Sequence, residues 1–352
     1  MKAQGGVVFE HVTKRYGDVA AVDDVSFEVH PGTLVTLLGP SGCGKTTTLR
    51  MVAGLEAATT GRILIGGNDV TRRAANERDV SMVFQSYALF PHMNVLDNVC
   101  YGPLSMNMPR DKAREIAHAK LSMLGLAGLE SRLPSELSGG QQQRVAVARS
   151  LVLEPAVLLF DEPLSNLDAK LRRRVRQEIR ELQQSLDLTV IYVTHDQEEA
   201  LAVSDQVIVM ERGRIAQQGT PAELYEAPRS RFLADFIGDA NLVTGELVHG
   251  AAGAQFESGD VSLPVHANGV AAGPATLAVR PHRLRLTAAN AGMLPAECLR
   301  AAYLGSRVEY VLGTPWGELL VFDDNVRTPI ARGARAGVSF APDDVIVIPG
   351  QA

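Results

Sequence analysis

Up to about residue 237, short apolar runs alternate along the chain with segments of amphipathic, helical period. Short apolar runs bounded by turn residues predict buried strands, and the amphipathic segments predict helices. We expect strands at residues 7–9, 25–29, 33–38, 62–65, 80–84, 156–160, 189–193, 207–210 and 214–217. We expect helices at residues 47–55, 110–126, 138–153, 168–186 and 220–224. This alternation predicts an α/β fold for the first part of the chain.

The pattern changes near Gly238. Beyond it the chain is rich in Gly, Ala and Val, with short alternating strands at fairly regular intervals. Residues 308–312 and 319–322 flank a short turn and predict a hairpin. We therefore expect two domains, residues 1–237 and 238–352, the second a small all-β barrel of a kind that binds ligands or partners. It shows no catalytic constellation.

Residues 39–47 fit the phosphate-binding pattern G-x-x-x-x-G-K-[ST], with a strand predicted before them and a helix after. The glycines let successive backbone N–H groups point inward, and the helix N-terminus adds its positive dipole end. Lys45 can reach the β- and γ-phosphates of a nucleotide, and the Thr46 hydroxyl can ligate Mg²⁺. The alternative is a glycine-rich turn that binds nothing, which the strand–loop–helix context disfavours.

The strand predicted at residues 156–160 ends in Asp161 and Glu162. A strand that ends in adjacent carboxylates, downstream of a phosphate loop, is where an Mg²⁺-binding Asp belongs. A Glu directly after it can act on the attacking water.

Ser138, Gly139 and Gly140 open the helix predicted to run to about residue 153. Ser is a good N-cap, and the glycines expose backbone N–H groups, so this is a second anion-binding helix start. The alternative is that the glycines cap the end of a preceding helix.

Three further features each allow two interpretations. Tyr16 could stack on adenine beside the phosphate loop, although plain packing is more common for such a ring. Residues 85–93 are apolar and aromatic without a clean period, which is typical of a buried loop or of a surface for a partner. We interpret the arginines at 172–174 as a solvated helix face rather than a ligand site.

Composition narrows the class of protein. The net charge of −6 argues against a nucleic-acid partner. The 3 cysteines, Cys43, Cys100 and Cys298, are far apart and odd in number, which favours a reducing cytosol over a disulfide framework. The N-terminus has no apolar core of a secretion signal, and no apolar run of about 18 residues is present to span a membrane.

Taken together, the motifs over about residues 5–237 resemble those of an ABC-transporter ATP-binding subunit. They occur in the family's order: Tyr16, residues 39–47, Gln85, residues 137–144, 157–162 and 165–168, and His195. The rest of the chain resembles the C-terminal OB-like domain of importer ATPases of the maltose, polyamine and ferric-iron branches. Arg280, Pro281 and His282 fall where that domain usually has Arg-Pro-Glu, so His282 departs from the pattern.

The resemblance implies a P-loop NTPase with a RecA-like core and a helical subdomain at about residues 86–155. It implies ATP and Mg²⁺, with Thr46, Gln85 and Asp161 holding the metal ion. Glu162 would be the general base and His195 would position the γ-phosphate, with Lys45 as a further catalytic residue. The implied nucleotide-binding residues are Tyr16, Gly39, Ser41, Gly42, Cys43, Gly44, Lys45, Thr46, Thr47 and Gln85.

The same resemblance implies partners. Ser138, Gly139, Gly140 and Gln141 would serve the nucleotide held by the opposite subunit of a head-to-tail homodimer. The segment ending at Asp168 would communicate between the two sites. Residues 85–93 would dock on an integral membrane permease at the inner face of the membrane, and a solute-binding protein would act indirectly.

The solute is less defined by the sequence. Residues 196–201, 236–241 and 339–344 look more like the polyamine, ferric-iron and phosphonate branch, which we favour. Asn166, followed by residues 169–172, looks more like the sugar branch. A soluble ABC ATPase would show two cassettes or a long coiled-coil insert, and a non-hydrolysing ATP sensor would lack Glu162. A regulatory role of the barrel could coexist with transport.

Overall fold

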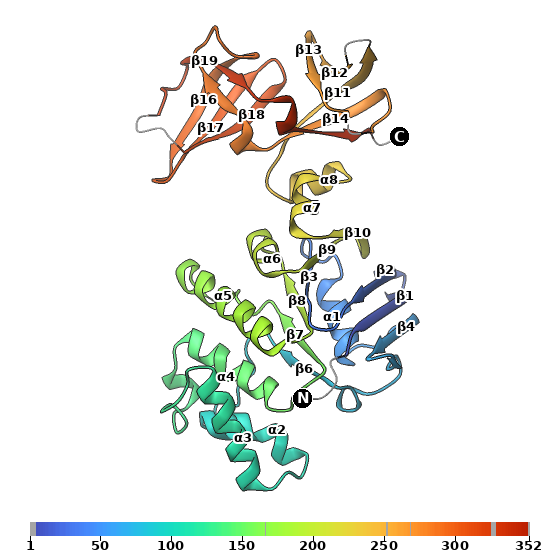
Figure 1. Ribbon diagram of the computed structural model, residues 1–352, viewed down its shortest axis with the longest axis vertical. Coiled ribbons are helices and arrows are strands. Elements are labelled where there is room, and N and C mark those ends of the chain that lie inside the picture. The colour runs from blue at the N-terminus through green and yellow to red at the C-terminus, as the bar shows by residue number, and fades with distance from the viewer. Residues whose placement is uncertain (1–4, 166, 251–252, 268, 325–328, 351–352) are drawn as a thin grey trace. The chain divides into compact units, whose positions relative to one another are not determined.

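The computed structural model describes residues 5–165, 167–250, 253–267, 269–324 and 329–350 (Figure 1). The chain forms two compact units, Met1–Pro221 and Ala222–Ala352. We expected the boundary near residue 238, but the units divide after Pro221. Two short helices, α7 (Pro221–Glu226) and α8 (Arg231–Phe236), lie between these two positions. Buried Arg280 donates hydrogen bonds to the carbonyls of Tyr225 and Ala234, so these helices are tied to the second unit.

A six-stranded sheet forms the centre of the first unit. Its order is β10-β9-β3-β8-β7-β6, and all neighbours are parallel except the edge strand β10. The strands are β3 (Leu34–Leu38), β6 (Val80–Val83), β7 (Val157–Asp161), β8 (Val190–Thr194), β9 (Gln206–Glu211) and β10 (Arg214–Gly219). Every residue of β3, β7 and β8 is buried, as the continuous apolar runs predict for strands covered on both faces.

A second, antiparallel sheet in this unit has the order β2-β1-β4-β5. Its strands are β1 (Val7–Tyr16), β2 (Val19–Val29), β4 (Thr60–Ile65) and β5 (Asn68–Asp69). The expected strands at 7–9 and 25–29 are the buried ends of one long hairpin. The apolar pattern stops short because the turn end of the hairpin is largely exposed. Helix α1 (Lys45–Ala53) shares a hydrophobic core with both sheets.

The helical part of this unit comprises α2 (Val95–Ser105), α3 (Arg110–Met123) and α4 (Gly139–Leu151). Figure 1 shows them grouped away from α1. Helix α2 was not predicted, because Gly102 and Pro103 disfavour a helix interior. Tertiary packing outweighs that preference, since Val95, Val99 and Cys100 are buried in a core shared with α3 and α4. Helices α5 (Ala169–Leu186) and α6 (Gln197–Val203) follow β7 and β8.

The second unit contains two five-stranded antiparallel sheets, with orders β13-β12-β11-β14-β20 and β15-β19-β16-β17-β18. The strands are β11 (Asn241–Gly250), β12 (Gly253–Ser258), β13 (Val261–Val265), β14 (Gly273–Val279), β15 (Arg285–Thr287), β16 (Leu294–Tyr303), β17 (Val308–Thr314), β18 (Gly317–Asp323), β19 (Arg335–Ser339) and β20 (Val345–Pro349). Both sheets contribute to one core. The all-β prediction is confirmed, and β17 and β18 form the expected hairpin.

Candidate nucleotide-binding site

The residues expected to carry chemistry gather at one edge of the central sheet. The strands β3, β8, β7 and β6 are neighbours and run parallel, so their carboxyl ends meet there. The phosphate loop follows β3, Glu162 follows β7, His195 follows β8 and Gln85 lies two residues beyond β6. Ligands of open α/β sheets bind in the crevice outside the carboxyl ends of the strands.

The phosphate loop lies between β3 and α1, in the strand–loop–helix context that the pattern requires. Gly44 caps α1 with a φ of 104°, and a Cβ atom there would lie 2.5 Å from the carbonyl oxygen of Ala21. A Cβ atom at Gly39 would collide with the carbonyl oxygen of Met210. Both positions therefore require glycine, and the backbone can wrap closely around a ligand.

Lys45 and Cys43 are the buried side chains of the loop, exposed by 5% and 4%. The Lys45 ammonium donates hydrogen bonds to the carbonyl oxygens of Gly39 at 2.7 Å and Pro40 at 2.9 Å, and lies 3.6 Å from Cys43 Sγ. The lysine charge is thus held inside the loop, where a phosphate would compete with neutral carbonyls for it. The Cys43 N–H donates a hydrogen bond to the Pro40 carbonyl at 3.3 Å and its thiol is buried, whereas Ser41 and Gly42 are exposed.

The side-chain oxygens of Thr46 and Asp161 lie close together. The Thr46 hydroxyl lies 3.4 Å from Asp161 Oδ1, and Thr47 follows on the same helical turn. Burial raises the pKa of Asp161 above its ordinary value, so a cation beside it would offset the cost of the buried charge. Hydroxyl, carboxylate and amide oxygens suit Mg²⁺, so these residues fit the metal ion implied by the resemblance. Exposed Gln85 lies at the same sheet edge, because Val83 of β6 pairs with Phe160 of β7.

Glu162 and His195 are in contact. His195 Nδ1 lies 3.1 Å from Glu162 Oε2, and the Glu162 N–H donates to the Val193 carbonyl at 3.0 Å. Glu162 has a left-handed φ of 46°, which costs a non-glycine residue about 1–3 kcal/mol. The backbone therefore turns sharply after Asp161, and a carboxylate and an imidazole from neighbouring strands face each other at the sheet edge.

Arg172 is a residue of this region that the sequence interpretation missed. Its guanidinium donates to the Leu167 carbonyl at 3.2 Å and to Asp196 Oδ2 at 3.4 Å. Its Nε lies 3.7 Å from Glu199. The solvated-face interpretation is therefore wrong for Arg172, whereas Arg174 is 71% exposed and fits it. The spacing in the sequence could have indicated these contacts, because Arg172 lies one helical turn after Asp168, which caps the helix.

Glu199 is the buried carboxyl group of this network. It accepts hydrogen bonds from Thr194 Oγ1 at 2.8 Å and from the Tyr192 hydroxyl at 3.3 Å. Burial raises the pKa of its carboxyl group. Arg172 thus joins the segment before α5 to the start of α6, immediately after His195.

We predict that Arg172→Ala lowers the free energy of unfolding by about 1–3 kcal/mol, since it removes the charged contacts with Asp196 and with the buried Glu199 carboxyl group. Arg173→Ala, on the same helix but exposed, should change it by less than about 0.5 kcal/mol. Urea denaturation of both variants measures the difference. Equal stability of the two would contradict a structural role for the Arg172 contacts.

Ser138 caps α4. Its hydroxyl accepts from the Gln141 N–H at 3.4 Å, while its own N–H donates to Gln141 Oε1 at 2.9 Å. Gly139 and Gly140 lie in the first turn of α4, so the alternative in which they end a preceding helix is wrong. Cβ atoms at these glycines would lie 3.3 Å from the Leu167 and Leu171 side chains, respectively. The start of α4 therefore packs beside the start of α5.

The start of α4 is separate from the phosphate loop. Helix α4 packs on α2, α3 and β6, and α1 packs on β7, β8, β2 and β6, with no packing of α1 on α4 among the main contacts of the described residues (Figure 1). No hydrogen bond or ion pair joins the first turn of α4 to the loop within the part of the chain that the structure describes. Asp168 caps α5 by accepting from the Leu171 N–H at 2.9 Å. Asn166, which favoured the sugar branch, lies outside the described residues.

Tyr16 ends β1 and is 49% exposed, so the core-packing alternative is wrong. The Lys14 ammonium lies 4.8 Å from the centroid of its ring. Stacking of this half-exposed ring on adenine stays a prediction.

The stretch at residues 85–93 is in part the buried loop that the sequence allowed. Tyr87 is buried, and Arg149 donates to the carbonyls of Tyr87 and Ala88 at 2.9 and 2.7 Å. The Asn98 amide holds Phe90 and Met93 in place. Large exposed apolar side chains follow nearby on α2 and directly after it: Tyr101, Leu104 and Met106.

In the second unit, His282 lies beside Arg280 and Tyr225. The Arg280 guanidinium is 4.3 Å from the Tyr225 ring centroid, and the His282 ring stacks on the same tyrosine at 6.3 Å. Burial lowers the pKa of His282. An aromatic ring stacked on Tyr225 therefore stands where the resemblance leads us to expect an acid.

Comparison with known proteins agrees with this geometry. The ABC transporter family matches residues 22–165, and the TOBE domain matches residues 277–348. An Fe(3+) ions import ATP-binding protein of Rhizobium meliloti (strain 1021) is 57% identical, covering 99% of each chain. A protein of the same description from Agrobacterium fabrum is 60% identical, covering 91% of each chain.

Among solved structures, a bacterial ABC transporter cassette described as dimeric is similar to this chain. It is 30% identical with a TM-score of 0.55, and the similarity covers 61% of this chain and 98% of that one. The same cassette is also known in a post-hydrolysis state bound to ADP and phosphate. No helix in the described ranges is long and apolar enough to cross a membrane.

The phosphate loop, the carboxylates after β7 and the histidine after β8 lie together on a P-loop fold followed by an all-β domain. The sequence matches cover nearly the whole chain. The chain belongs to the ABC transporter family, as an ATP-hydrolysing, importer-type ATP-binding subunit with a C-terminal OB-like domain.

Proposed function

We propose that this chain hydrolyses ATP to drive uptake of ferric iron through a separate permease at the inner face of the membrane. The observation that carries the hydrolytic part is the contact between Glu162 and His195 at the sheet edge that also holds Lys45 and Asp161. Ferric iron is supported by the names of the similar proteins, which are 57% and 60% identical.

In the proposed mechanism, the loop N–H groups bind the phosphates of ATP. Lys45 exchanges its contacts with the Gly39 and Pro40 carbonyls for the β- and γ-phosphates. Thr46, Asp161 and Gln85 would hold Mg²⁺, which when bound supplies positive charge beside the γ-phosphate.

Glu162 then accepts the proton of the attacking water, and His195 orients this carboxylate and contacts the γ-phosphate. The left-handed backbone at Glu162 fixes the direction in which the carboxylate leaves β7. The loop amides and Lys45 supply most of the charge stabilisation, because phosphoryl transfer depends mainly on positioning and electrostatics.

Two copies of the chain would form the complete site. The first turn of α4 is a second anion-binding helix start, formed by Ser138, Gly139, Gly140 and Gln141. The nucleotide of the same chain does not need it, because the phosphate loop already supplies one helix N-terminus. The dimeric cassette among similar structures supports this arrangement. Asp168 fixes the start of α5 beside α4. The segment that ends at Asp168 would therefore couple the two nucleotide sites of the dimer.

Residues 85–93 would dock on the permease. The loop is held by Arg149 and Asn98, while Tyr101, Leu104 and Met106 are exposed apolar side chains on or next to α2. Exposed apolar side chains beside a well-supported loop fit a partner surface. A solute-binding protein would act only through the permease.

Tyr16→Ala should weaken ATP binding by about 1–3 kcal/mol, the usual worth of stacking a base on an aromatic ring. Tyr16→Phe, which keeps the ring, should bind nearly as well as the natural protein. Equilibrium titration with a fluorescent ATP analogue measures both. An unchanged dissociation constant in Tyr16→Ala would exclude adenine stacking.

Solute identity is tested with the chain reconstituted with its neighbouring permease and binding protein in liposomes. We expect ATP-dependent uptake of radiolabelled ferric iron, and none of maltose or of a polyamine. Sugar uptake without iron uptake would overturn the ferric-iron proposal and support the sugar-branch alternative.

A further inference from the structure

Lys14 lies directly beside Tyr16, the residue expected to stack on adenine. Both belong to β1, and the Lys14 ammonium lies over the Tyr16 ring, 4.8 Å from its centroid. The lysine side chain is only 12% exposed, although the tyrosine is half-exposed. One face of the ring is therefore covered by a cation, and the opposite face is the one on which a base can stack.

The segment that follows α1 holds Lys14 in place. The Lys14 ammonium pairs with Glu56 Oε1 at 2.6 Å and donates a hydrogen bond to the Ala57 carbonyl at 2.8 Å. This segment is itself fixed against β1, because the Thr59 N–H donates to the Thr13 carbonyl at 2.8 Å. An ammonium group has three N–H donors, and here it meets a carboxylate, a carbonyl and an aromatic ring. Lys14 is therefore an anchored cation whose charge is already paired.

Glu56 also acts on the Tyr16 side chain. Partial burial and the Glu56 carboxylate raise the pKa of Tyr16, and hydrogen bonds from Lys14 and Tyr16 lower the pKa of Glu56. The ring is thus contacted at its face by the ammonium and at its hydroxyl by the carboxylate. Two contacts at different parts of the ring fix its orientation.

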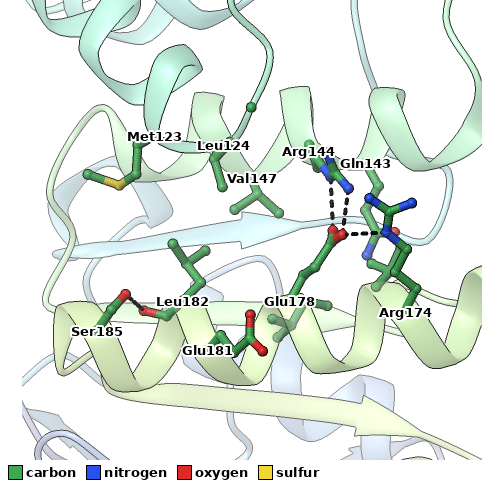
Figure 2. A pocket seen from close by; sticks show the side chains of 13 residues that line it. Met123, Leu124, Gln143, Arg144, Val147, Arg174, Glu178, Glu181, Leu182 and Ser185 are labelled. Atoms are coloured by element: carbon green, nitrogen blue, oxygen red, sulfur yellow. Dashed lines mark hydrogen bonds and ion pairs between the residues drawn. The ribbon is translucent and has the colours of Figure 1, made fainter.

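An ordinary surface ion pair of the same unit differs from this arrangement. Arg174 is 71% exposed and donates to Glu178 at 3.1 Å, one turn further along α5, as Figure 2 shows. No cation–π contact involves Arg174 in the ranges that the structure describes. Exposed pairs of this kind contribute little to stability, so Arg174 offers a matched control for Lys14.

We propose that Lys14 is a positioning residue for the adenine base of ATP, acting through Tyr16 and held in place by Glu56. The ammonium is attracted to the negative face of the ring and keeps the ring in one orientation, and adenine stacks on the other face. This inference rests on the proposed function, because it assumes that Tyr16 stacks on the base. Since the Lys14 charge is paired with Glu56, Lys14 serves base binding and takes no part in the chemical step.

The test measures the dissociation constants of ATP and of inorganic tripolyphosphate with the full-length protein by isothermal titration calorimetry. Tripolyphosphate carries the phosphate chain of ATP without the base, so it reports on the phosphate loop alone. Lys14→Met should weaken ATP binding about threefold to fivefold, the usual worth of a cation–π contact, and leave tripolyphosphate binding unchanged. Glu56→Gln, which loosens the ammonium, should weaken ATP binding by about twofold. Arg174→Met should change neither constant.

Two further measurements separate positioning from a general structural effect. In steady-state hydrolysis, Lys14→Met should raise KM by about threefold to fivefold and leave kcat unchanged, because only ground-state binding is lost. If Lys14 acts through the ring, Lys14→Met combined with Tyr16→Ala should bind ATP no more weakly than Tyr16→Ala alone.

Natural ATP affinity in Lys14→Met would overturn the inference. Equal losses of ATP and tripolyphosphate binding would also overturn it, as would additive losses in the double variant. These outcomes leave the hydrolytic function intact, because Lys45 and Glu162 are unchanged in the variants. Unchanged ATP affinity in Tyr16→Ala would overturn base stacking and the role of Lys14 together. Absence of ATP binding by the natural protein would instead overturn the proposed function itself.

Discussion

Glu162→Gln should bind ATP nearly as tightly as the natural protein and lose turnover by about 10²–10⁴-fold, the usual cost of removing a general base. The amide is nearly isosteric with the carboxylate and can keep a hydrogen bond with His195, so the sharp turn after Asp161 should persist. It cannot accept the proton of the attacking water. The variant should accumulate as an ATP-bound dimer, measured by size-exclusion chromatography with and without ATP.

Glu198→Gln provides the matched control. It makes the same substitution at an exposed carboxylate in the first turn of α6, three residues after His195. Its turnover and ATP affinity should equal those of the natural protein. Near-normal steady-state hydrolysis by Glu162→Gln would remove Glu162 from the role of base, whatever its contact with His195.

Gly140→Asp should reduce hydrolysis by on the order of 10²-fold or more, comparable to losing one preorganised donor at a developing anion. Gly140 is buried in the first turn of α4, and an added Cβ would lie 3.3 Å from Leu171. The new carboxylate would place negative charge where the partner's γ-phosphate is expected. ATP binding to the separate subunit should survive, because the phosphate loop is on other elements.

Two substitutions at the same position separate size from charge. Gly140→Ala requires only a small shift of the flexible Leu171 side chain and should keep most of the activity. Gly140→Asn matches Asp in shape without its charge and should fall between the two. If Gly140→Asp abolishes ATP binding by the isolated monomer, the first turn of α4 serves the nucleotide of its own chain.

The contiguous motifs were predictable from the sequence because the local structure of each one depends only on residues that are neighbours in the chain. The loop from Gly39 to Thr47 requires glycines at fixed places, and the apolar strand before Asp161 identifies the sheet edge. The parallel order of β3, β8, β7 and β6 then brings these parts together.

Relations between distant segments were not predictable in the same way. Arg172 looked like part of an arginine run, because its partners Asp196 and Glu199 lie on another helix. Helix α2 was missed because a glycine and a proline disfavour it locally, while packing against α3 and α4 decides the outcome.

The composite site of two chains is tested most directly by mixing Lys45→Ala protein with Gly140→Asp protein and measuring ATP hydrolysis. In a head-to-tail heterodimer, one site combines the intact Lys45 of one subunit with the intact Gly140 of the other, and the second site carries both changes. We predict that the mixture recovers activity well above that of either variant alone. If each chain completes its own site, every site in the mixture keeps one damaged motif, and no recovery on mixing would contradict the two-chain arrangement.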